Sequence, residues 1–282
     1  MTAKAAGAPV TVVILTLDEA ANLPQALESV CGWAQRVFVL DSGSTDGTDA
    51  IARRFGCDFF HHSFEGYARQ RNWALDRLPF ETDWVLFLDA DEFVTPELKA
   101  ELAAVLGAET GMDGFFVKRR LMWMGRWIRR GCYPTWILRV FRRSRGRYGD
   151  RPVNEHAIVD GAVGYLVHDL IHADRKGLSD WTQKHVRYAA YEARELLRNR
   201  TDDRDVEPRL LGDQVARKRW LRVKVWERLP PLVRPFLYFT YRYILRGGFL
   251  DGREAFIYHV LQALWFPLII DLTYLEIKRG WR

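Results

Sequence analysis

Short apolar runs alternate with segments of helical periodicity over roughly the first 110 residues. Four runs have the length and composition of buried strands: Val10–Thr16, Arg36–Asp41, Cys57–His61 and Trp84–Asp89. The segments that follow them predict helices near Glu19–Cys31, Asp46–Phe55, Gly66–Leu78 and Pro96–Leu106. Such alternation, with apolar strands, predicts an α/β fold in which a mostly parallel sheet is flanked by helices on both faces.

The regular alternation ends after about residue 110. The stretch Lys118–Arg151 holds twelve Lys and Arg against one acid, Asp150, and tryptophans are interleaved with them. An amphipathic helix is expected at Ser179–Asn199, and the charged segment Arg200–Glu207 resembles a linker. We therefore expect a main domain over residues 1–200, with halves at about 8–110 and 111–200, and a basic, aromatic helical extension over 201–282.

Acids and hydroxyls gather where three of the predicted strands end. The three sets are Thr16, Asp18 and Glu19; Asp41, Ser42, Ser44, Thr45 and Asp46; and Asp89, Asp91 and Glu92. Ligands of parallel α/β sheets bind beyond the carboxyl ends of the strands. For Ser44, Thr45 and Asp46, capping of the next helix is an equally good explanation. It is weaker for Asp89 and Asp91, because Pro96 places the start of the following helix further along.

The pair Asp89 and Asp91 predicts a cation site. Residues i and i+2 of an extended segment point the same way, so the two carboxylates could converge. Like charges that close repel one another unless a cation lies beside them. Oxygen ligands suit Mg²⁺ or Mn²⁺, which keep several waters and also bind substrate phosphates. The sequence therefore predicts a partial metal site that a diphosphate would complete.

Composition limits the alternatives without choosing among them. With 48% hydrophobic residues in 282, the chain can bury a full core. The net charge of +6 permits anionic partners such as nucleotides, nucleic acid, lipid headgroups or acidic sugars. The three cysteines are far apart and show no metal or redox spacing, which favours free thiols in a reducing compartment. The N-terminus lacks the apolar core of a signal peptide, so we expect a cytoplasmic protein.

An ordered set of motifs resembles the family 2 glycosyltransferases of the GT-A fold. The set is TLDEAANL, DSGSTDGT, GYARQRNWALD and LFLDADE. Further motifs make the chain similar to the bacterial lipopolysaccharide core β-glucosyltransferases: GRWIRRGCYP, ILRVFRR, RPVNEHAIVDG and RGGFLDG. The resemblance runs from Val10 to about Gly252 and implies an inverting, metal-dependent transfer of a hexose, with glucose expected, from a UDP-sugar.

The resemblance also implies a role for each matching residue. Nucleotide-sugar binding falls to Thr16, Glu19, Asp41, Ser42, Arg71 and Asp89. Asp91 would bind the divalent cation, Mn²⁺ or Mg²⁺, that bridges the diphosphate. His172 would complete the metal site, because enzymes of this fold often add a late histidine to the acid pair. For His168, four residues earlier, a structural role is expected instead.

An inverting transfer needs a general base on the acceptor side of the sugar. Glu155 matches the glutamate that the subgroup carries after its basic segment. This sequence departs from the pattern there, with Asn154 where a histidine is expected and a histidine at 156, which puts His156 in doubt as a functional residue. Glu92 is the rival base, and a plain salt bridge with nearby arginines is the structural alternative for Glu155.

The basic stretch Lys118–Arg151 allows two interpretations. It could be a solvated face, or it could bind a phosphorylated or sugar acceptor, since arginine grips phosphate and tryptophan stacks on sugar rings. We favour the second and expect acceptor contacts from Arg126, Trp127, Arg130 and Trp136.

The C-terminal extension is expected to lie on the inner face of the cytoplasmic membrane. Arg209–Arg246 holds ten Lys and Arg against two acids, with many aromatic residues among them. The final run Phe256–Ile277 is interrupted by polar residues, and we expect it to fall short of a membrane span. The alternative is packing of these aromatics on the main domain or on another subunit.

The expected function is transfer of a hexose to a cell-envelope glycolipid or lipid-linked glycan, such as lipopolysaccharide core. Two alternatives stay open: a nucleotidyl- or phosphotransferase with the same metal site, and a non-catalytic, basic membrane or nucleic-acid adaptor. Nucleic-acid binding is disfavoured because the sequence shows no helix-turn-helix, zinc-finger or RNP motif.

Overall fold

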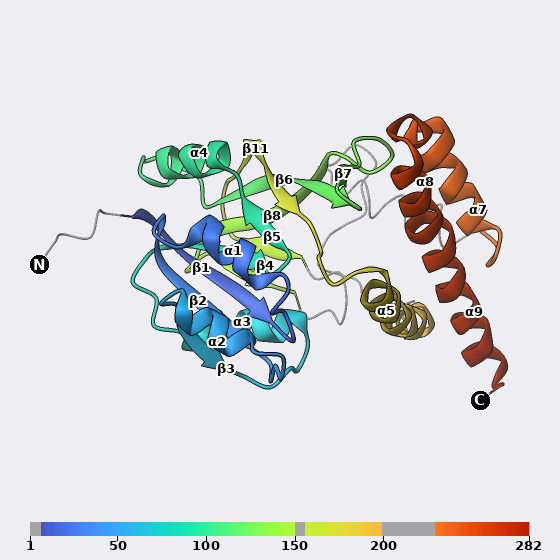
Figure 1. The fold of residues 1–282 in the computed structure, drawn as a ribbon, viewed down its shortest axis with the longest axis horizontal. Helices are drawn as coiled ribbons and strands as arrows, with labels where there is room; N and C mark the ends of the chain where they lie inside the picture. The colour runs from blue at the N-terminus through green and yellow to red at the C-terminus, as the bar shows by residue number, and fades with distance from the viewer. Residues whose placement is uncertain (1–6, 150–155, 199–228, 282) are drawn as a thin grey trace, which may run out of the picture. The chain divides into compact units, whose positions relative to one another are not determined.

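A computed structural model describes residues 7–149, 156–198 and 229–281 (Figure 1). The chain divides into two compact units, Met1–Trp127 with Tyr133–Gly177, and Ile128–Cys132 with Leu178–Arg282. The helix expected near Ser179–Asn199 thus belongs with the C-terminal helices. The functional boundary near residue 200 stays a prediction, and the expected linker Arg200–Glu207 lies outside the described residues.

The first unit is built on one mixed sheet. Its strands are β1 (Ala8–Thr16), β2 (Ala34–Asp41), β3 (Asp58–His61), β4 (Trp84–Asp89), β5 (Glu92–Val94), β6 (Gly114–Trp123), β7 (Arg126–Trp127), β8 (Thr135–Arg142) and β11 (Val163–His172). The strand order is β3-β2-β1-β4-β8-β6-β11-β5, and β7 pairs with β6. A separate hairpin joins β9 (Gly146–Tyr148) to β10 (Ala157–Val159).

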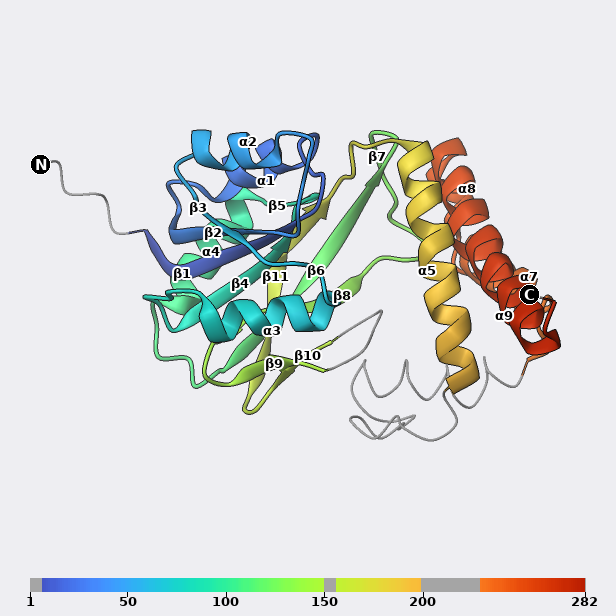
Figure 2. The same ribbon diagram turned by 90° about the horizontal axis from the view of Figure 1, so that it is seen from below.

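Helices cover both faces of the first four strands (Figure 2). They are α1 (Leu23–Val30), α2 (Thr48–Arg54), α3 (Tyr67–Arg77) and α4 (Pro96–Leu106). Alternate strand residues enter two separate cores. One core includes apolar side chains of α1, α2 and α4, and the other includes those of α3. Burial on both faces explains why the strands are nearly continuous apolar runs.

The sequence predicted the parallel half of the sheet and not the other half. Strands β1, β2, β3 and β4 pair in parallel, as expected, with β1 central. Beyond them β8 is antiparallel to β4 and to β6, and β11 runs parallel to β6. All three cysteines are free thiols, and the Sγ atoms of Cys31 and Cys57, far apart in sequence, lie 3.5 Å apart.

The second unit is helical. Its elements are α5 (Leu178–Arg198), α7 (Arg234–Phe239), the π-helix η2 (Thr240–Leu245), the 3₁₀ turn η3 (Gly248–Asp251), α8 (Arg253–His259), the π-helix η4 (Val260–Trp265) and α9 (Phe266–Arg279). The last three form one helix, which packs against α5 and α7.

The expectation that the final run falls short of a membrane span was wrong. Within the described residues, the helix Arg253–Arg279 is long and apolar enough to cross a membrane by length and composition alone. Only Asp271 and Glu276 among the interrupting residues are charged, so the run keeps a high mean hydropathy.

Candidate active site

The carboxyl ends of β1, β2 and β4 meet at one edge of the sheet. Thr16 lies opposite Asp41 in the parallel register, and Leu15 lies opposite Asp89. The hydroxyl of Thr16 donates a hydrogen bond of 2.8 Å to Asp41 Oδ1. Two of the three predicted acid clusters are therefore joined directly, and the third is on the neighbouring strand.

The loops after β1 and β2 are held together by the acids and hydroxyls that the sequence singled out. Asp18 Oδ1 accepts from the Thr45 backbone N–H at 2.8 Å, and its own N–H donates to Ser44 Oγ at 2.7 Å. Asp46 accepts from Thr48 and, at 2.8 Å, from the Ala20 N–H. These side chains thus fix the two loops to each other, whereas side-chain capping of α2 is limited to Asp46, one residue outside the Gly47 N-cap.

Asp41 has its hydrogen-bonding capacity filled from within its own loop. Oδ2 accepts from the N–H groups of Gly43 and Ser44, and Oδ1 accepts from the hydroxyls of Thr16 and Ser44. A carboxylate offers about four such positions. Burial raises the pKa of Asp41, but these hydrogen bonds lower it more, so the net pKa is below its usual value. Asp41 is an ionised anchor of the loop, and any direct contact with a nucleotide stays a prediction.

Ser42 and Gln70 connect this loop to α3. The Ser42 N–H donates to the Thr16 carbonyl at 3.0 Å, and its hydroxyl accepts from Gln70 Nε2 at 3.1 Å. Gln70 is buried and also bonds His62. The loop that Ser42 begins is therefore supported from two elements, which suits a site that must be formed before its ligand arrives.

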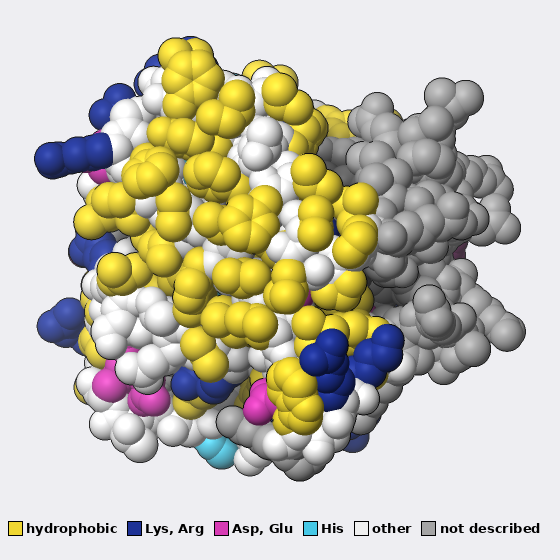
Figure 3. Space-filling view, turned by 90° about the vertical axis from the view of Figure 1, so that its right-hand side faces the viewer, with side chains coloured by type: hydrophobic (Ala, Val, Ile, Leu, Met, Phe, Trp, Pro, Cys, Tyr) yellow, Lys and Arg dark blue, Asp and Glu magenta, His cyan; other side chains and the backbone are white. Residues whose placement is uncertain are grey.

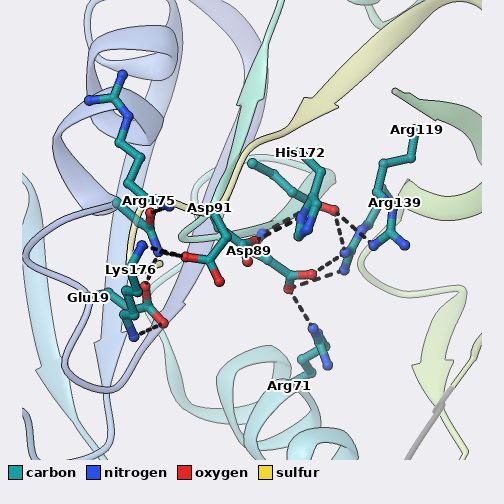
Figure 4. A network of polar contacts seen from close by, with 12 residues as sticks. Glu19, Arg71, Asp89, Asp91, Arg119, Arg139, His172, Arg175 and Lys176 are labelled. Carbon is teal, nitrogen blue, oxygen red and sulfur yellow. Dashed lines mark hydrogen bonds and ion pairs between the residues drawn. The ribbon is translucent and has the colours of Figure 1, made fainter. Parts of the chain in front are cut away.

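Asp89 lies between two arginines from different elements (Figure 4). Arg71 on α3 bonds Asp89 Oδ1 at 2.8 Å, and Arg139 on β8 bonds both carboxylate oxygens. Burial raises the pKa of Asp89. The charges of Arg139 and Arg71 lower the pKa by more than burial raises it, so the net pKa is well below its ordinary value. Arg71, predicted to approach the nucleotide, is itself buried and reaches the site through this ion pair.

Glu92, the rival for the general base, is fully buried. Its Oε1 lies 3.0 Å from Arg139 Nη2 and 3.6 Å from Arg119 Nη1, and its Oε2 accepts from the Asp89 N–H. Burial raises the pKa of Glu92; Arg139 opposes this rise and the Asp89 charge adds to it. A carboxylate without solvent access and with arginine partners positions its neighbours and is poorly placed to deprotonate an acceptor.

Arg139→Met is expected to destabilise the fold by about 3–5 kcal/mol, because it removes a shared cation from two buried carboxylates. The melting temperature should fall by roughly 10 °C, on a scale of about 2–4 °C per kcal/mol for a domain of this size. The control is Arg142→Met on the same strand, whose half-exposed ion pairs at 3.7 and 3.8 Å contribute about 1 kcal/mol or less. Equal thermal losses in the two variants would contradict the proposed role.

Asp91 and His172 are brought together from segments eighty residues apart. His172 ends β11, opposite Glu92 of β5, and its Nδ1 lies 3.2 Å from Asp91 Oδ1. The distance suits an ion pair, yet Nδ1 is buried without hydrogen-bond geometry to any partner in the described residues. A buried ring nitrogen beside a carboxylate oxygen fits two ligands of a shared cation.

The residues present fit a cation whose coordination is completed by oxygens of the substrate. Among the described residues, no group of three or more His, Cys, Asp and Glu side chains is placed to hold a metal ion. Mg²⁺ and related ions are commonly held by only one or two protein carboxylates together with phosphate and water. Asp91 and His172 therefore supply a partial site, whereas both carboxylate oxygens of Asp89 are bonded to arginines.

Glu19 and Lys176 close the other side of the site. Lys176 Nζ lies 2.7 Å from Glu19 Oε1, and Asn22 donates to Glu19 Oε2 at 2.8 Å. Burial raises the pKa of Glu19, against the lowering effect of those two bonds. Asn22 also accepts from the Arg175 N–H, so the segment after β11 is tied to the loop after β1. This tie places a lysine next to Glu19, as Figure 4 shows.

The four residues expected to bind the acceptor lie in different surroundings. Trp136 on β8 has Lys118 over its ring at 5.7 Å and Tyr165 against its edge. Trp127 carries Arg120 at 4.1 Å from its ring centre. Arg126 is exposed. Arg130 belongs to the second unit, where its Nη1 pairs with Asp251 at 2.9 Å, so part of its role is structural.

The structure bears differently on the predictions for Glu155 and His168. Glu155, the expected base, lies outside the described residues, as does Asn154. His168 bonds Glu101 at 2.8 Å and is half exposed, which agrees with the structural role expected for it.

Several residues of the site were not predicted from the sequence. Arg139 lies in the ILRVFRR motif, and the spacing of that motif along β8 gave no sign that this arginine, out of several, is buried. Lys176, Asn22 and Asp169 were also not singled out. Asp169 is buried on β11 and bonds Arg120 at 3.0 Å and the Tyr133 hydroxyl at 3.0 Å. A buried acid inside an apolar strand was the signal that could have identified it.

A half-parallel sheet with acids at three strand ends and a histidine beside one of them is the arrangement expected of the GT-A fold. A sequence model described as glycosyl transferase family 2 matches residues 11–165. The chain belongs to this family, which confirms the resemblance noted in its motifs.

Curated relatives of this chain are described as glycosyltransferases. The lipopolysaccharide core biosynthesis glycosyltransferase LpsC of Rhizobium meliloti (strain 1021) is 32% identical over 167 residues, 55% of this chain and 59% of LpsC. An uncharacterized glycosyltransferase of Rickettsia felis is 34% identical over 99 residues, 35% of this chain and 34% of its own length. The alignments thus cover less than two thirds of each relative.

A solved structure confirms the fold class. The mannosyltransferase PcManGT from Pyrobaculum calidifontis, solved in complex with GDP-Man and Mn²⁺, is 16% identical, has a TM-score of 0.51, and covers 98% of this chain and 89% of its own. At that identity the likeness extends to the fold alone.

Proposed function

We propose that this protein is an inverting, metal-dependent hexosyltransferase that moves a sugar, with glucose expected, from UDP to a cell-envelope glycolipid such as lipopolysaccharide core. The observation that carries the proposal is the convergence of Asp91 Oδ1 and His172 Nδ1 at 3.2 Å, without hydrogen-bond geometry, beside the strand ends that carry Thr16, Asp41 and Asp89. The similarity to LpsC supports the acceptor class.

The residues around Asp91 and Glu19 support binding of a nucleoside diphosphate. Asp91 and His172 would hold Mn²⁺ or Mg²⁺, which would neutralise the departing diphosphate. The chain's own contribution is to orient that group: Lys176 offers a further cation at the same edge, held 2.7 Å from Glu19. The related-fold mannosyltransferase was solved with GDP-Man and Mn²⁺, so the choice of UDP over GDP rests on the motif resemblance.

The acceptor half supports contact with a sugar or phosphate. Tyr165, half exposed, stacks on Phe116 with ring centres 5.0 Å apart and meets Trp136 edge-on. Lys118 lies over Trp136 and 3.6 Å from Asp169. Aromatic faces among cations suit a phosphorylated glycan, since rings stack on sugars and cations hold phosphate.

The reaction needs a base that Glu155 would supply. The acceptor hydroxyl attacks the anomeric carbon opposite the departing nucleoside diphosphate, its proton passes to the carboxylate, and the new glycosidic bond has inverted configuration. Activity would take place on the cytoplasmic side, at the inner face of the membrane, where a lipid-linked acceptor is accessible.

A donor screen tests the proposal. UDP with Mn²⁺ is expected to raise the melting temperature by several degrees, because a ligand that binds only the folded state stabilises it by mass action. UDP-glucose, GDP-mannose and a dTDP-sugar should be compared with and without Mn²⁺, with slow hydrolysis monitored. Release of free UDP supports glycosyl transfer. Release of pyrophosphate would favour a nucleotidyltransferase, and no nucleotide effect at all would favour an adaptor.

A further inference from the structure

The C-terminal helices carry their large apolar side chains on the outside. From the N-cap of α7 to the end of η2 the exposed residues recur at helical spacing: Val233, Phe236, Leu237, Tyr241, Ile244 and Leu245. Phe249, Leu250, Phe256 and Leu272 of the following elements are exposed as well. Figure 3 shows hydrophobic side chains gathered over one broad face of these helices. We name these ten residues the apolar face.

The same helices bury charged groups on their inner side. Arg234, only 4% exposed, donates to Asp271 Oδ1 from Nε at 2.7 Å and also from Nη2. The other oxygen of Asp271 accepts from the Leu232 N–H at 2.8 Å. The buried ion pair of Arg234 and Asp271 therefore lies within a turn or two of the exposed Phe236 and Leu237.

A second buried polar cluster joins the helices to the segment Ile128–Cys132. Asp251 accepts from the N–H groups of Arg129 and Arg130, at 2.7 and 2.6 Å. Arg242, also buried, donates to the Gly131 carbonyl at 3.1 Å. The RGGFLDG motif thus binds the GRWIRRGCYP motif within this unit.

This arrangement is the reverse of a water-soluble surface helix, which turns charges outward and apolar side chains inward. Exposing ten large apolar side chains to water while burying paired charges is costly, and contiguous patches of that kind mark interaction sites. The reversal is expected where the outer face meets an apolar phase, because charges there must pair inside the protein.

The packing indicates a helix that lies along a surface. In the helix Arg253–Arg279 the fully inward residues are spaced four apart: Ala255, His259, Ala263, Pro267 and Asp271. Its neighbour α7–η2 has twelve residues, from 234 to 245, or roughly 18 Å at 1.5 Å per residue. That is too short for a hydrocarbon core of about 30 Å. Its other neighbour, α5, is rich in charged residues.

Basic residues accompany the apolar face at both ends of the long helix. Arg253 and Arg246 are exposed near its start, and Lys278 and Arg279 near its end, followed by exposed Trp281. Cations beside an apolar surface complement anionic headgroups, each contributing on the order of 1 kcal/mol. In a dimer formed through the same face, like charges would be brought together, so a second copy is the less suitable partner.

We infer that the apolar face docks on an anionic bilayer, with the long helix in the plane of the headgroups and its apolar side chains in the outer acyl layer. The occupant is a lipid surface and the helix does not cross it. This surface stands on its own observations and does not depend on which sugar the enzyme transfers.

Flotation of the purified full-length chain tests the inference. Vesicles of phosphatidylcholine with about a quarter phosphatidylglycerol should carry the protein upward at low salt. Binding should weaken at about 0.5 M salt, where the Debye length is only a few ångströms, and on pure phosphatidylcholine. Alkaline carbonate should release the protein from the vesicles. Resistance to carbonate would overturn the in-plane arrangement in favour of a crossing helix.

Matched variants separate this surface from general stickiness. Phe236→Ser with Leu245→Ser should lower the partition coefficient about tenfold, from the apolar area removed. The control, Val163→Ser with Val167→Ser, replaces two exposed valines of β11 and should change it less than twofold. Circular dichroism and nucleotide-induced thermal shift check that each variant is folded.

Two outcomes would assign the face to another occupant and overturn the inference. One is a dimer in light scattering that the Phe236/Leu245 variant dissociates, without vesicle binding. The other is a monomer that fails to float at low salt, which would mean that a segment of the chain itself covers the face. Both results leave donor binding measurable, so failure here is distinct from failure of the proposed function.

Discussion

Asp91→Asn is expected to abolish sugar transfer and Mn²⁺-dependent binding of UDP while leaving the protein folded. Asp91 is the carboxylate that faces His172 Nδ1 at 3.2 Å, and asparagine keeps its size but loses the charge that a divalent cation requires. Because the cation stabilises the leaving diphosphate by several kcal/mol, turnover should fall by at least about a thousandfold. Transfer measured by UDP release, with calorimetry of UDP binding at varied Mn²⁺, checks both parts.

The stability of the variant distinguishes a metal ligand from a structural acid. Asp91 lies near the partly buried carboxylate of Glu19 and contributes to the raised pKa of that group, so its neutralisation should leave the melting temperature unchanged or slightly higher. The comparison variant is Asp89→Asn, which should melt lower because Arg71 and Arg139 lose their shared anion. Near-normal transfer by Asp91→Asn with metal present would contradict the proposed metal site.

The parallel half of the fold was predictable because its signals are local. Each strand from Val10 to Asp89 is an apolar run ended by acids or hydroxyls, and the predicted strand at Trp84–Asp89 agrees with β4 at both ends. The first helix was expected from Glu19 but begins at Leu23, since residues 19–22 are used to tie loops together. Element type was therefore more predictable than its limits.

The remaining half of the site depends on pairings that no local pattern encodes. His172 meets Asp91, and Arg139 meets Asp89, only because β11 and β8 enter the same sheet as β4 and β5 from far along the chain. In the basic stretch, arginines with different functions have the same sequence context. Arg139 neutralises buried acids, Arg120 pairs with Asp169 against Trp127, and Arg130 is held by Asp251.

The C-terminal half shows a different limit of sequence reasoning. Its aromatic and basic residues led us to expect a membrane-facing segment, which stays a prediction, and the pattern did not reveal which side of the helices each residue occupies. Arg234 and Arg242 look like exposed charges and are buried, whereas Phe236 and Leu245 look like core residues and are exposed. Only the pairing of Arg234 with Asp271, 37 residues away, resolves the orientation of the helix.

Glu155→Gln is expected to lower turnover by at least about a hundredfold, the usual scale for a lost general base, while UDP and Mn²⁺ bind as before. The matched comparison is Glu92→Gln. Glu92 is fully buried against Arg139 and Arg119, and it cannot reach an acceptor hydroxyl without the site opening. The Glu92→Gln substitution should therefore lower the melting temperature. Turnover, measured below that temperature, should stay within a few-fold of the parent.

The pair of variants separates the two candidates because they move different quantities. A general base acts on an acceptor-dependent step, so Glu155→Gln should lose transfer far more than the slow hydrolysis of the donor, and its loss should appear in kcat. A salt-bridge role for Glu155 would instead lower thermal stability and affect both reactions alike. If Glu155→Gln keeps turnover within a few-fold while Glu92→Gln loses a hundredfold, the proton acceptor is the buried glutamate, and the arginine cluster around Asp89 must open during catalysis.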